Sequence, residues 1–134
     1  TRLEPTLYEA EWAYLPLYND LGKNSKGIVY SYDGQASGKM KVGFIGGQPE
    51  NYAEWSEVYS EKGGRYNMTI NYSFGRQLDL TVNAITTRIN ALADDDNHHQ
   101  ITVPVELKPG YNVIRMCNSY NWAPDIDNFT LAKE

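Results

Sequence analysis

The stretch Tyr66-Asn-Met-Thr-Ile-Asn-Tyr-Ser-Phe74 places an apolar or aromatic side chain at every second position, with polar side chains between them. A strict period of two is typical of a β-strand with one buried face and one wet face. After Gly75-Arg76 the same alternation resumes in Leu78-Asp-Leu-Thr-Val82. Two alternating runs joined by a short connection predict a β-hairpin, so we expect a protein built from strands.

Outward from this hairpin, the chain continues as short segments divided by residues that favour turns. The other segments expected to be strands are 7–12, 28–33, 39–45, 52–59, 84–92, 101–107, 111–117 and 125–132. Residues 84–92 also fit a helical turn through Ile85, Ile89 and Leu92, but their two threonines favour a strand. Roughly ten short strands without an amphipathic helix predict an all-β fold, either a β-sandwich or a barrel.

Length and charge limit what the protein can be. A chain of 134 residues is expected to form a single domain over 1–134, with residues 1–6 as a linker or terminal extension. Because the chain begins at Thr1 without a signal-peptide pattern, we expect a processed piece of a larger protein. The net charge of −5 argues against nucleic acid and anionic membranes as partners. No apolar run approaches the roughly 18 residues of a membrane span.

The sequence lacks the common motifs of enzymes, such as G-x-S-x-G, H-E-x-x-H and the phosphate-binding loop. The single Cys117 excludes an internal disulfide and is typical of a small core residue. The adjacent His98 and His99 point opposite ways in an extended segment, so they cannot share a metal without a bend. Paired carboxylates can serve a glycosidase, but a small sandwich has little room for the cleft that this requires. We therefore expect a protein that is not an enzyme.

Acidic residues stand near both ends of the chain with the same spacing. Glu9 and Glu11 are two residues apart, as are Asp125 and Asp127. On strands each pair shares a face, and pairing of the two strands would bring four carboxylates together. Two such charges about 4 Å apart repel by roughly 4 kcal/mol, so the cluster must face water, share protons or bind a cation. We expect calcium, which prefers oxygen ligands; ordinary solvent-facing positions are the alternative.

Aromatic and amide side chains gather on the predicted loops. The candidates for a sugar-binding site are Phe44, Tyr52, Asn118, Tyr120, Asn121 and Trp122. A flat ring matches the apolar face of a pyranose, and a neighbouring amide bonds its hydroxyl groups. The alternative is that rings near strand ends plug the core, which we expect for Trp55 and leave open for Phe44 and Tyr52.

Taken in order, these motifs resemble those of the β-sandwich carbohydrate-binding modules of families six, thirty-five and thirty-six, most nearly family thirty-five. The stretches that carry the resemblance are Tyr8-Glu-Ala-Glu11, Val42-Gly-Phe-Ile45, Gly64-Arg-Tyr-Asn-Met-Thr-Ile70, Leu80-Thr-Val-Asn83, Val105-Glu-Leu-Lys-Pro-Gly-Tyr-Asn-Val-Ile-Arg115 and Pro124-Asp-Ile-Asp127.

The resemblance implies a jelly-roll-like β-sandwich of two antiparallel sheets. It implies a structural calcium (Ca2+) held by Glu9, Glu11 and Asp127, with Asp125 matching less closely, and by backbone carbonyls.

The resemblance also implies a shallow glycan site on loops at one end of the sheets. There Phe44 stacks on sugar, and the last loop supplies Asn121 and Trp122. Asn97-His-His-Gln100 stands where many relatives place a tryptophan, which leaves the class of sugar open.

The function implied is that of a non-catalytic, calcium-stabilised carbohydrate-binding module. It would be an accessory domain of a secreted polysaccharide-degrading enzyme, placed outside the cell or at its surface. Its partners would be a plant or microbial polysaccharide or oligosaccharide and a parent catalytic domain in the same polypeptide. The alternative is a structural or interaction β-sandwich domain that packs on a catalytic domain without a sugar site of its own.

Overall fold

The computed structural model of the protein describes residues 6–9, 12–15, 29–32, 40–43, 45, 52–73, 75–91, 99–118 and 123–133. These residues form ten β-strands. The strands are β1 (Thr6–Glu9), β2 (Val29–Tyr32), β3 (Met40–Gly43), β4 (Ala53–Ser60), β5 (Gly64–Ser73), β6 (Arg76–Val82), β7 (Ile85–Ala91), β8 (His99–Leu107), β9 (Gly110–Cys117) and β10 (Asp125–Lys133). Within the described residues, no helix is long and apolar enough to cross a membrane.

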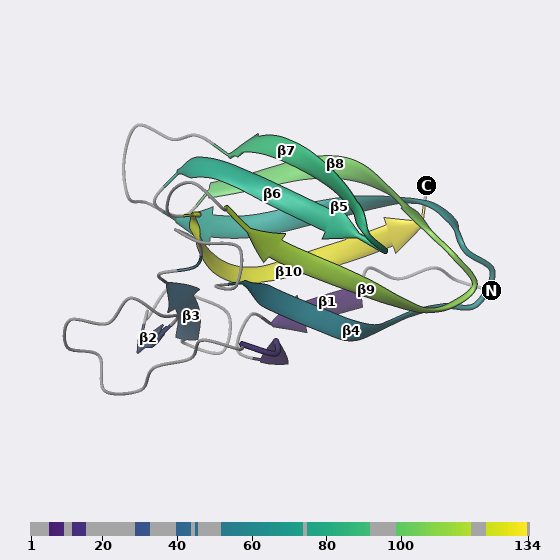
Figure 1. Cartoon of the computed structure of the whole chain (residues 1–134), viewed down its shortest axis with the longest axis horizontal. Helices are drawn as coiled ribbons and strands as arrows, with labels where there is room; N and C mark the ends of the chain where they lie inside the picture. Colours follow the sequence, from purple (N-terminus) through teal and green to yellow (C-terminus); the bar gives the residue numbers. More distant parts are fainter. Residues whose placement is uncertain are drawn as a thin grey trace.

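The strands form two antiparallel sheets, which Figure 1 shows as two layers. The larger sheet has six strands, in the order β2-β3-β10-β5-β8, with β1 also paired to β10. The smaller sheet has four strands, in the order β4-β9-β6-β7. The predicted all-β fold, a sandwich of two antiparallel sheets, is therefore confirmed.

The last strand, β10, is paired along both of its edges. One edge pairs with β5 over its whole length. On the other edge, Ile126 lies opposite Val42 of β3, and residues 128–131 lie opposite β1. The first and last strands of the described chain are therefore neighbours, as the sequence predicts.

A cluster of three aromatic rings joins the two sheets in the core. Phe129 of β10 is fully buried. Its ring stacks on Tyr8 of β1, with centroids 5.1 Å apart, and meets the edge of Trp55 of β4 at 4.9 Å. The indole nitrogen of Trp55 donates a 3.0 Å hydrogen bond to the carbonyl of Glu9, so its polar atom is satisfied inside the core. The prediction that Trp55 is a core residue is confirmed, and Cys117 is also buried as expected.

Several strand boundaries differ from the sequence prediction, and both ends of the first strand are among them. The first strand begins at Thr6, which was expected to belong to the terminal extension, and it ends at Glu9. Trp12 lies outside the strands, although it falls within the predicted strand 7–12.

Within the ambiguous stretch 84–92, Ile85–Ala91 form a strand, β7, so the choice of strand over helix is confirmed. Its buried Ile89 and Ala91 and its exposed Ile85 fit an edge strand that leaves the core at one end.

The turn between β6 and β7 carries backbone strain. Val82 pairs with Ile85, so the turn consists of Asn83 and Ala84 alone. Both have positive φ, 49° and 73° respectively, which is the pattern of a type I′ hairpin turn. Asparagine adopts this conformation readily, whereas the Cβ of alanine crowds the backbone there.

We expect Ala84→Gly to raise the free energy of unfolding by about 1 kcal/mol, because glycine has no Cβ to strain the left-handed conformation. Chemical denaturation would measure the change. Ala91→Gly is the matched control, since Ala91 lies in an ordinary strand position, and it should lower stability by about 1 kcal/mol. Equal destabilisation by both variants would contradict the assigned turn.

Candidate functional site

The bases of the two loops that carry the predicted sugar-binding residues meet at one end of the sandwich, on the left of Figure 1. Ile45 follows β3 and Ala123 precedes β10, and the Ala123 amide donates a 2.7 Å hydrogen bond to the Ile45 carbonyl. Both residues are buried. Tyr52 precedes β4, and Asn118 follows β9, the antiparallel partner of β4. This end of the molecule therefore brings together positions that lie far apart in the sequence.

Four of the six predicted sugar-binding residues lie outside the described residues. They are Phe44, Tyr120, Asn121 and Trp122. Phe44 directly precedes Ile45, and Trp122 directly precedes Ala123. The described residues thus show that the chain segments leading to Phe44 and Trp122 are bonded to each other.

Asn118 is a buried amide at the base of the last loop. Its exposed fraction is 3%, and its Nδ2 donates a 3.0 Å hydrogen bond to the carbonyl of Gln77 in β6. This bond ties the end of β9 to the neighbouring strand. Asn118 is therefore placed to fix the position of the loop; direct contact of Asn118 with sugar stays a prediction.

Tyr52 is half-buried and belongs to a small network on the outer side of β4 and β9. The guanidinium of Arg115 lies over the Tyr52 ring, 3.7 Å from its centroid. Two nitrogens of Arg115 donate to Oε1 of Glu54, at 2.8 and 3.1 Å. The ring of Tyr14 meets Tyr52 at 6.5 Å with an angle of 62°. Stacking on one face and an edge contact hold the Tyr52 ring in place.

Two of the four predicted calcium ligands are buried at neighbouring positions of paired strands. Glu9 in β1 lies opposite Asn128, the residue after Asp127 in β10. The exposed fraction is 6% for both Glu9 and Asp127. The alternative that these carboxylates are ordinary solvent-facing positions is therefore wrong for this pair. Asp125 is half-buried at the start of β10, and Glu11 lies outside the described residues.

A β-bulge changes the orientation predicted for the late aspartates. The pairing of β10 with β5 shifts between Ile126 and Asn128. Ile126 and Phe129 are both fully buried although they are three residues apart, which strict alternation would place on opposite faces. The extra residue at the bulge is Asp127. The simple expectation that Asp125 and Asp127 share one face through regular alternation therefore does not hold.

The chemistry of the two buried carboxylates suits a cation. An ionised carboxylate only accepts hydrogen bonds, and its burial is costly unless opposite charge or donors compensate. Among the described residues, Oε2 of Glu9 and Oδ1 of Asp127 are buried atoms that accept no hydrogen bond, although both side chains have other interactions. Within the same residues, no group of three or more acidic, histidine or cysteine side chains gathers as a metal site.

Tyr72 and His99 lie side by side at the loop end, with ring centroids 6.0 Å apart. Burial raises the pKa of the Tyr72 phenol above its ordinary value, so its hydroxyl stays protonated at neutral and mildly alkaline pH. His99 is half-buried at the first position of β8, two residues before the predicted start of that strand. The two residues are also directly opposite each other in the pairing of β5 with β8.

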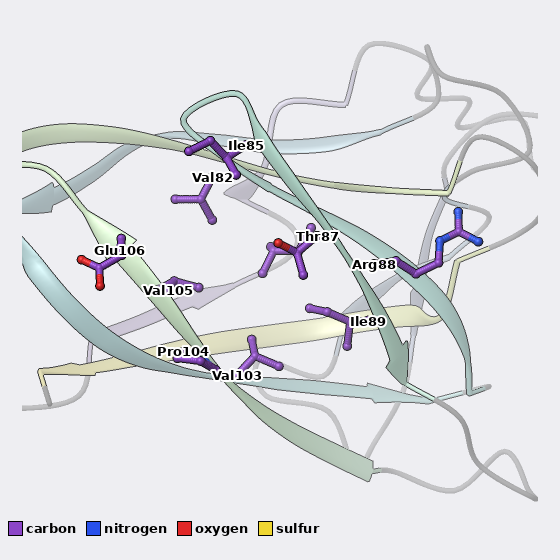
Figure 2. Close-up of a pocket in the computed structure, with 10 residues that line it drawn as sticks. Val82, Ile85, Thr87, Arg88, Ile89, Val103, Pro104, Val105 and Glu106 are labelled. Atoms are coloured by element: carbon purple, nitrogen blue, oxygen red, sulfur yellow. The ribbon is translucent and has the colours of Figure 1, made fainter.

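An apolar groove lies at the other edge of the sandwich, between β7 and β8 (Figure 2). Its volume is about 450 Å³, and most of its lining is aliphatic: Leu80, Val82, Ile85, Ile89, Val103, Pro104 and Val105. Figure 2 shows the labelled side chains of β6, β7 and β8 around the groove, with Glu106 and Arg88 at its borders. Aliphatic walls offer neither a flat ring nor enough polar groups for a sugar, so this groove is a poor glycan site.

No protein-family model and no curated protein matches the sequence. Solved structures do match. A family 35 carbohydrate-binding module from Clostridium thermocellum is similar at 27% identity, over 96% of this chain and 98% of that one, with a TM-score of 0.82. An exo-β-1,3-galactanase from Phanerochaete chrysosporium matches at 20% identity and a TM-score of 0.80, over 96% of this chain and 29% of its own length.

A third match is a GH26-CBM35 β-(1,4)-mannanase from Podospora anserina, at 22% identity and a TM-score of 0.76, over 97% of this chain and 28% of the mannanase. The chain therefore has the size of the whole bacterial module and of about a quarter to a third of each enzyme. The resemblance to family 35 modules predicted from the sequence is confirmed.

We expect Asn118→Ala to lower the free energy of unfolding by about 1–2 kcal/mol, because it leaves the Gln77 carbonyl without this donor. Denaturant unfolding would measure the loss. Asn90→Ala is the matched control: Asn90 also bonds to Gln77, but at an exposed site, so its removal should change stability by less than about 0.5 kcal/mol. Similar values for the two variants would argue against an anchoring role of Asn118.

Proposed function

We propose that this protein is a non-catalytic carbohydrate-binding module that holds a polysaccharide at the loop end of its sandwich. The observation that carries the proposal is the similarity, at 27% identity and nearly full length, to a family 35 carbohydrate-binding module. The described loop bases support it, because the Ile45–Ala123 hydrogen bond joins the segments that lead to Phe44 and Trp122.

Binding would rest on ring stacking and amide hydrogen bonds. Phe44 and Trp122 would stack on pyranose faces, Asn121 would bond hydroxyl groups, and Tyr120 would add a ring with a polar edge. Tyr52 and Asn118 would support these loops from their bases. A shallow site of this kind gives dissociation constants of roughly millimolar to micromolar, which corresponds to about −4 to −8 kcal/mol.

The biological role that follows is attachment of an enzyme to its substrate. The galactanase and the mannanase with similar domains are enzymes in which the matched region is about 28–29% of the chain. By analogy, this module would be part of a secreted polysaccharide-degrading enzyme. A catalytic domain tethered to a bound module meets its substrate at a high effective concentration, so weak binding is sufficient. The isolated module would not cleave glycans itself.

A structural calcium would stabilise the sandwich. Glu9 and Asp127 would provide carboxylate oxygens from paired strands, with Glu11 and Asp125 as further candidates. The burial of the Glu9 and Asp127 carboxylates supports this assignment, because a divalent cation compensates buried negative charge. The ion would join the first strand to the last.

We expect Trp122→Ala to abolish retention of the module by the polysaccharide it binds, while leaving the melting temperature nearly unchanged. Affinity electrophoresis in gels that contain galactan, mannan or xylan would measure the retention. Tyr59→Ala is the matched control, because Tyr59 is an exposed ring at the opposite end of β4 and should not affect retention.

Wild-type retention with no loss in Trp122→Ala would remove Trp122 from the site. A module that binds no glycan on a broad array would instead favour the alternative, in which the sandwich is a structural domain packed against a catalytic domain. Release of sugar from any of these polysaccharides by the isolated chain would contradict a non-catalytic role.

We expect chelation by EDTA to lower the melting temperature by roughly 10 °C, because a ligand present at about 100 times its dissociation constant stabilises the native state by about 2.7 kcal/mol. Calorimetry with and without calcium would measure the shift. Glu9→Gln should remove the calcium dependence, whereas Glu57→Gln, at an exposed position, should keep it. Identical melting in EDTA and calcium would contradict the proposed metal site.

A further inference from the structure

A hollow with a volume of about 370 Å³ lies beside the first half of β4. Two exposed rings, Trp12 and Tyr14, stand along one wall, with exposed fractions of 65% and 60%. Residues 54–57 of β4 form the facing wall, and Tyr8 also lines the hollow. Its volume falls within the range of about 300–1,000 Å³ that is typical of small-molecule sites.

The walls of this hollow are connected to each other. The backbones of Tyr14 and Glu54 exchange two hydrogen bonds, of 2.7 and 3.0 Å. The Glu54 side chain holds Arg115, Arg115 lies over Tyr52, and Tyr52 meets the edge of Tyr14. These side-chain contacts and the backbone bonds between Tyr14 and Glu54 together hold Tyr14 in place before any ligand arrives, which reduces the entropy lost on binding. The contacts also connect the hollow to the loop end, because Tyr52 belongs to both.

A β-bulge in β4 shapes the wall of the hollow that this strand forms. The pairing of β4 with β9 shifts between Trp55 and Val58, both of which are buried in the core. The residues between them, Ser56 and Glu57, are exposed and line the hollow. The bulge therefore presents a hydroxyl and a carboxylate next to the exposed rings.

Tyr8 completes the base of the hollow. Burial raises the pKa of its phenol, although a hydrogen bond with the backbone of Tyr59 acts in the opposite direction. Tyr8 thus remains neutral, and its ring is held by stacking on Phe129. Tyr8 therefore gives the hollow an uncharged surface whose ring packs directly on the core residue Phe129.

We propose that this hollow is a second sugar-binding subsite, which takes a neutral pyranose unit. The indole of Trp12 and the ring of Tyr14 offer flat apolar faces for stacking, and Ser56, Glu54 and Glu57 offer polar atoms for hydroxyl groups. The inference rests on the proposed function, since it assigns a further sugar unit to the same glycan-binding protein.

The charge of the hollow selects a neutral sugar. Glu54 is already paired with Arg115, whereas the described residues show no ion pair for Glu57, so a net negative charge remains at the rim. A uronate would bring a second carboxylate close to Glu57, and like charges at such distances repel. Neutral hydroxyl groups instead donate hydrogen bonds to the carboxylate.

The three tryptophans of the chain allow a direct test, because each reports on a different place. Trp12 reports on the hollow and Trp122 on the loop site. Trp55 lies between the hollow, which it also lines, and the core, where its indole nitrogen is bonded to Glu9. The experiment follows the indole N–H signals in two-dimensional NMR spectra during titration of the full chain with mannohexaose, galactohexaose and hexagalacturonate. Single Trp→Phe variants assign the signals.

With at least one neutral probe, the Trp12 signal should shift and saturate. The shift should persist in Trp122→Ala, which removes the loop site. Tyr14→Ala should raise the dissociation constant read from Trp12 by about ten-fold, the loss expected for one stacked ring. Tyr111→Ala, an exposed ring elsewhere on β9, should leave it unchanged.

Three results would overturn the proposal in distinguishable ways. If neutral probes shift Trp122 but not Trp12, the hollow is not a subsite and the proposed function stands. If the Trp12 shift disappears in Trp122→Ala, it was transmitted from the loop site. If hexagalacturonate shifts Trp12 as strongly as the neutral probes do, the subsite does not select neutral sugars. A protein in which neither Trp12 nor Trp122 responds to any probe contradicts the proposed function, and the subsite falls with it.

Discussion

Pairing of β10 along both of its edges is the constraint on which the rest of the structure depends. It places the first described strand, β1, next to the last one and connects both to β5 in the middle of the chain. The same strand carries Phe129, whose ring touches Tyr8 in its own sheet and Trp55 in the facing sheet. One strand thus organises the larger sheet, the contact between sheets and the position of the buried carboxylates.

The same pairing buries two acidic side chains, Glu9 and Asp127, which is electrostatically costly. Pairing of β1 with β10 brings Glu9 next to the bulge that contains Asp127, and both side chains are buried. A sandwich could avoid the cost of burying this charge with neutral residues at the two positions. If the proposed calcium binds there, these acidic residues would couple the stability of the fold to the calcium concentration of the surroundings.

The strands were predictable from the sequence because their signal is local. Strict alternation in residues 66–82 identified β5 and β6, whereas the edge strand β7 was identified from the strand preference of its two threonines. The two bulges were not predictable, since an extra residue in one strand depends on its partner, which a local pattern does not contain. Those bulges set the positions of Asp127 and Glu57. The arrangement of the candidate calcium ligands and the shape of the hollow therefore could not be predicted from the sequence. A signal for the hollow was present in Trp12-Ala-Tyr14-Leu15, where aromatic residues alternate with small or apolar ones that are buried.

The neighbouring positions of Thr6 and Leu131 have a topological consequence. The two ends of the paired strands emerge at the same pole of the sandwich, opposite the loops that follow β9 and precede β10. A short peptide could therefore join the ends, and the chain could be reopened elsewhere, for example at the exposed hairpin tip between β6 and β7. The scaffold is suited to circular permutation at this tip, which would preserve every strand neighbour and keep the new ends at the same pole, because the β6–β7 turn lies at that pole too.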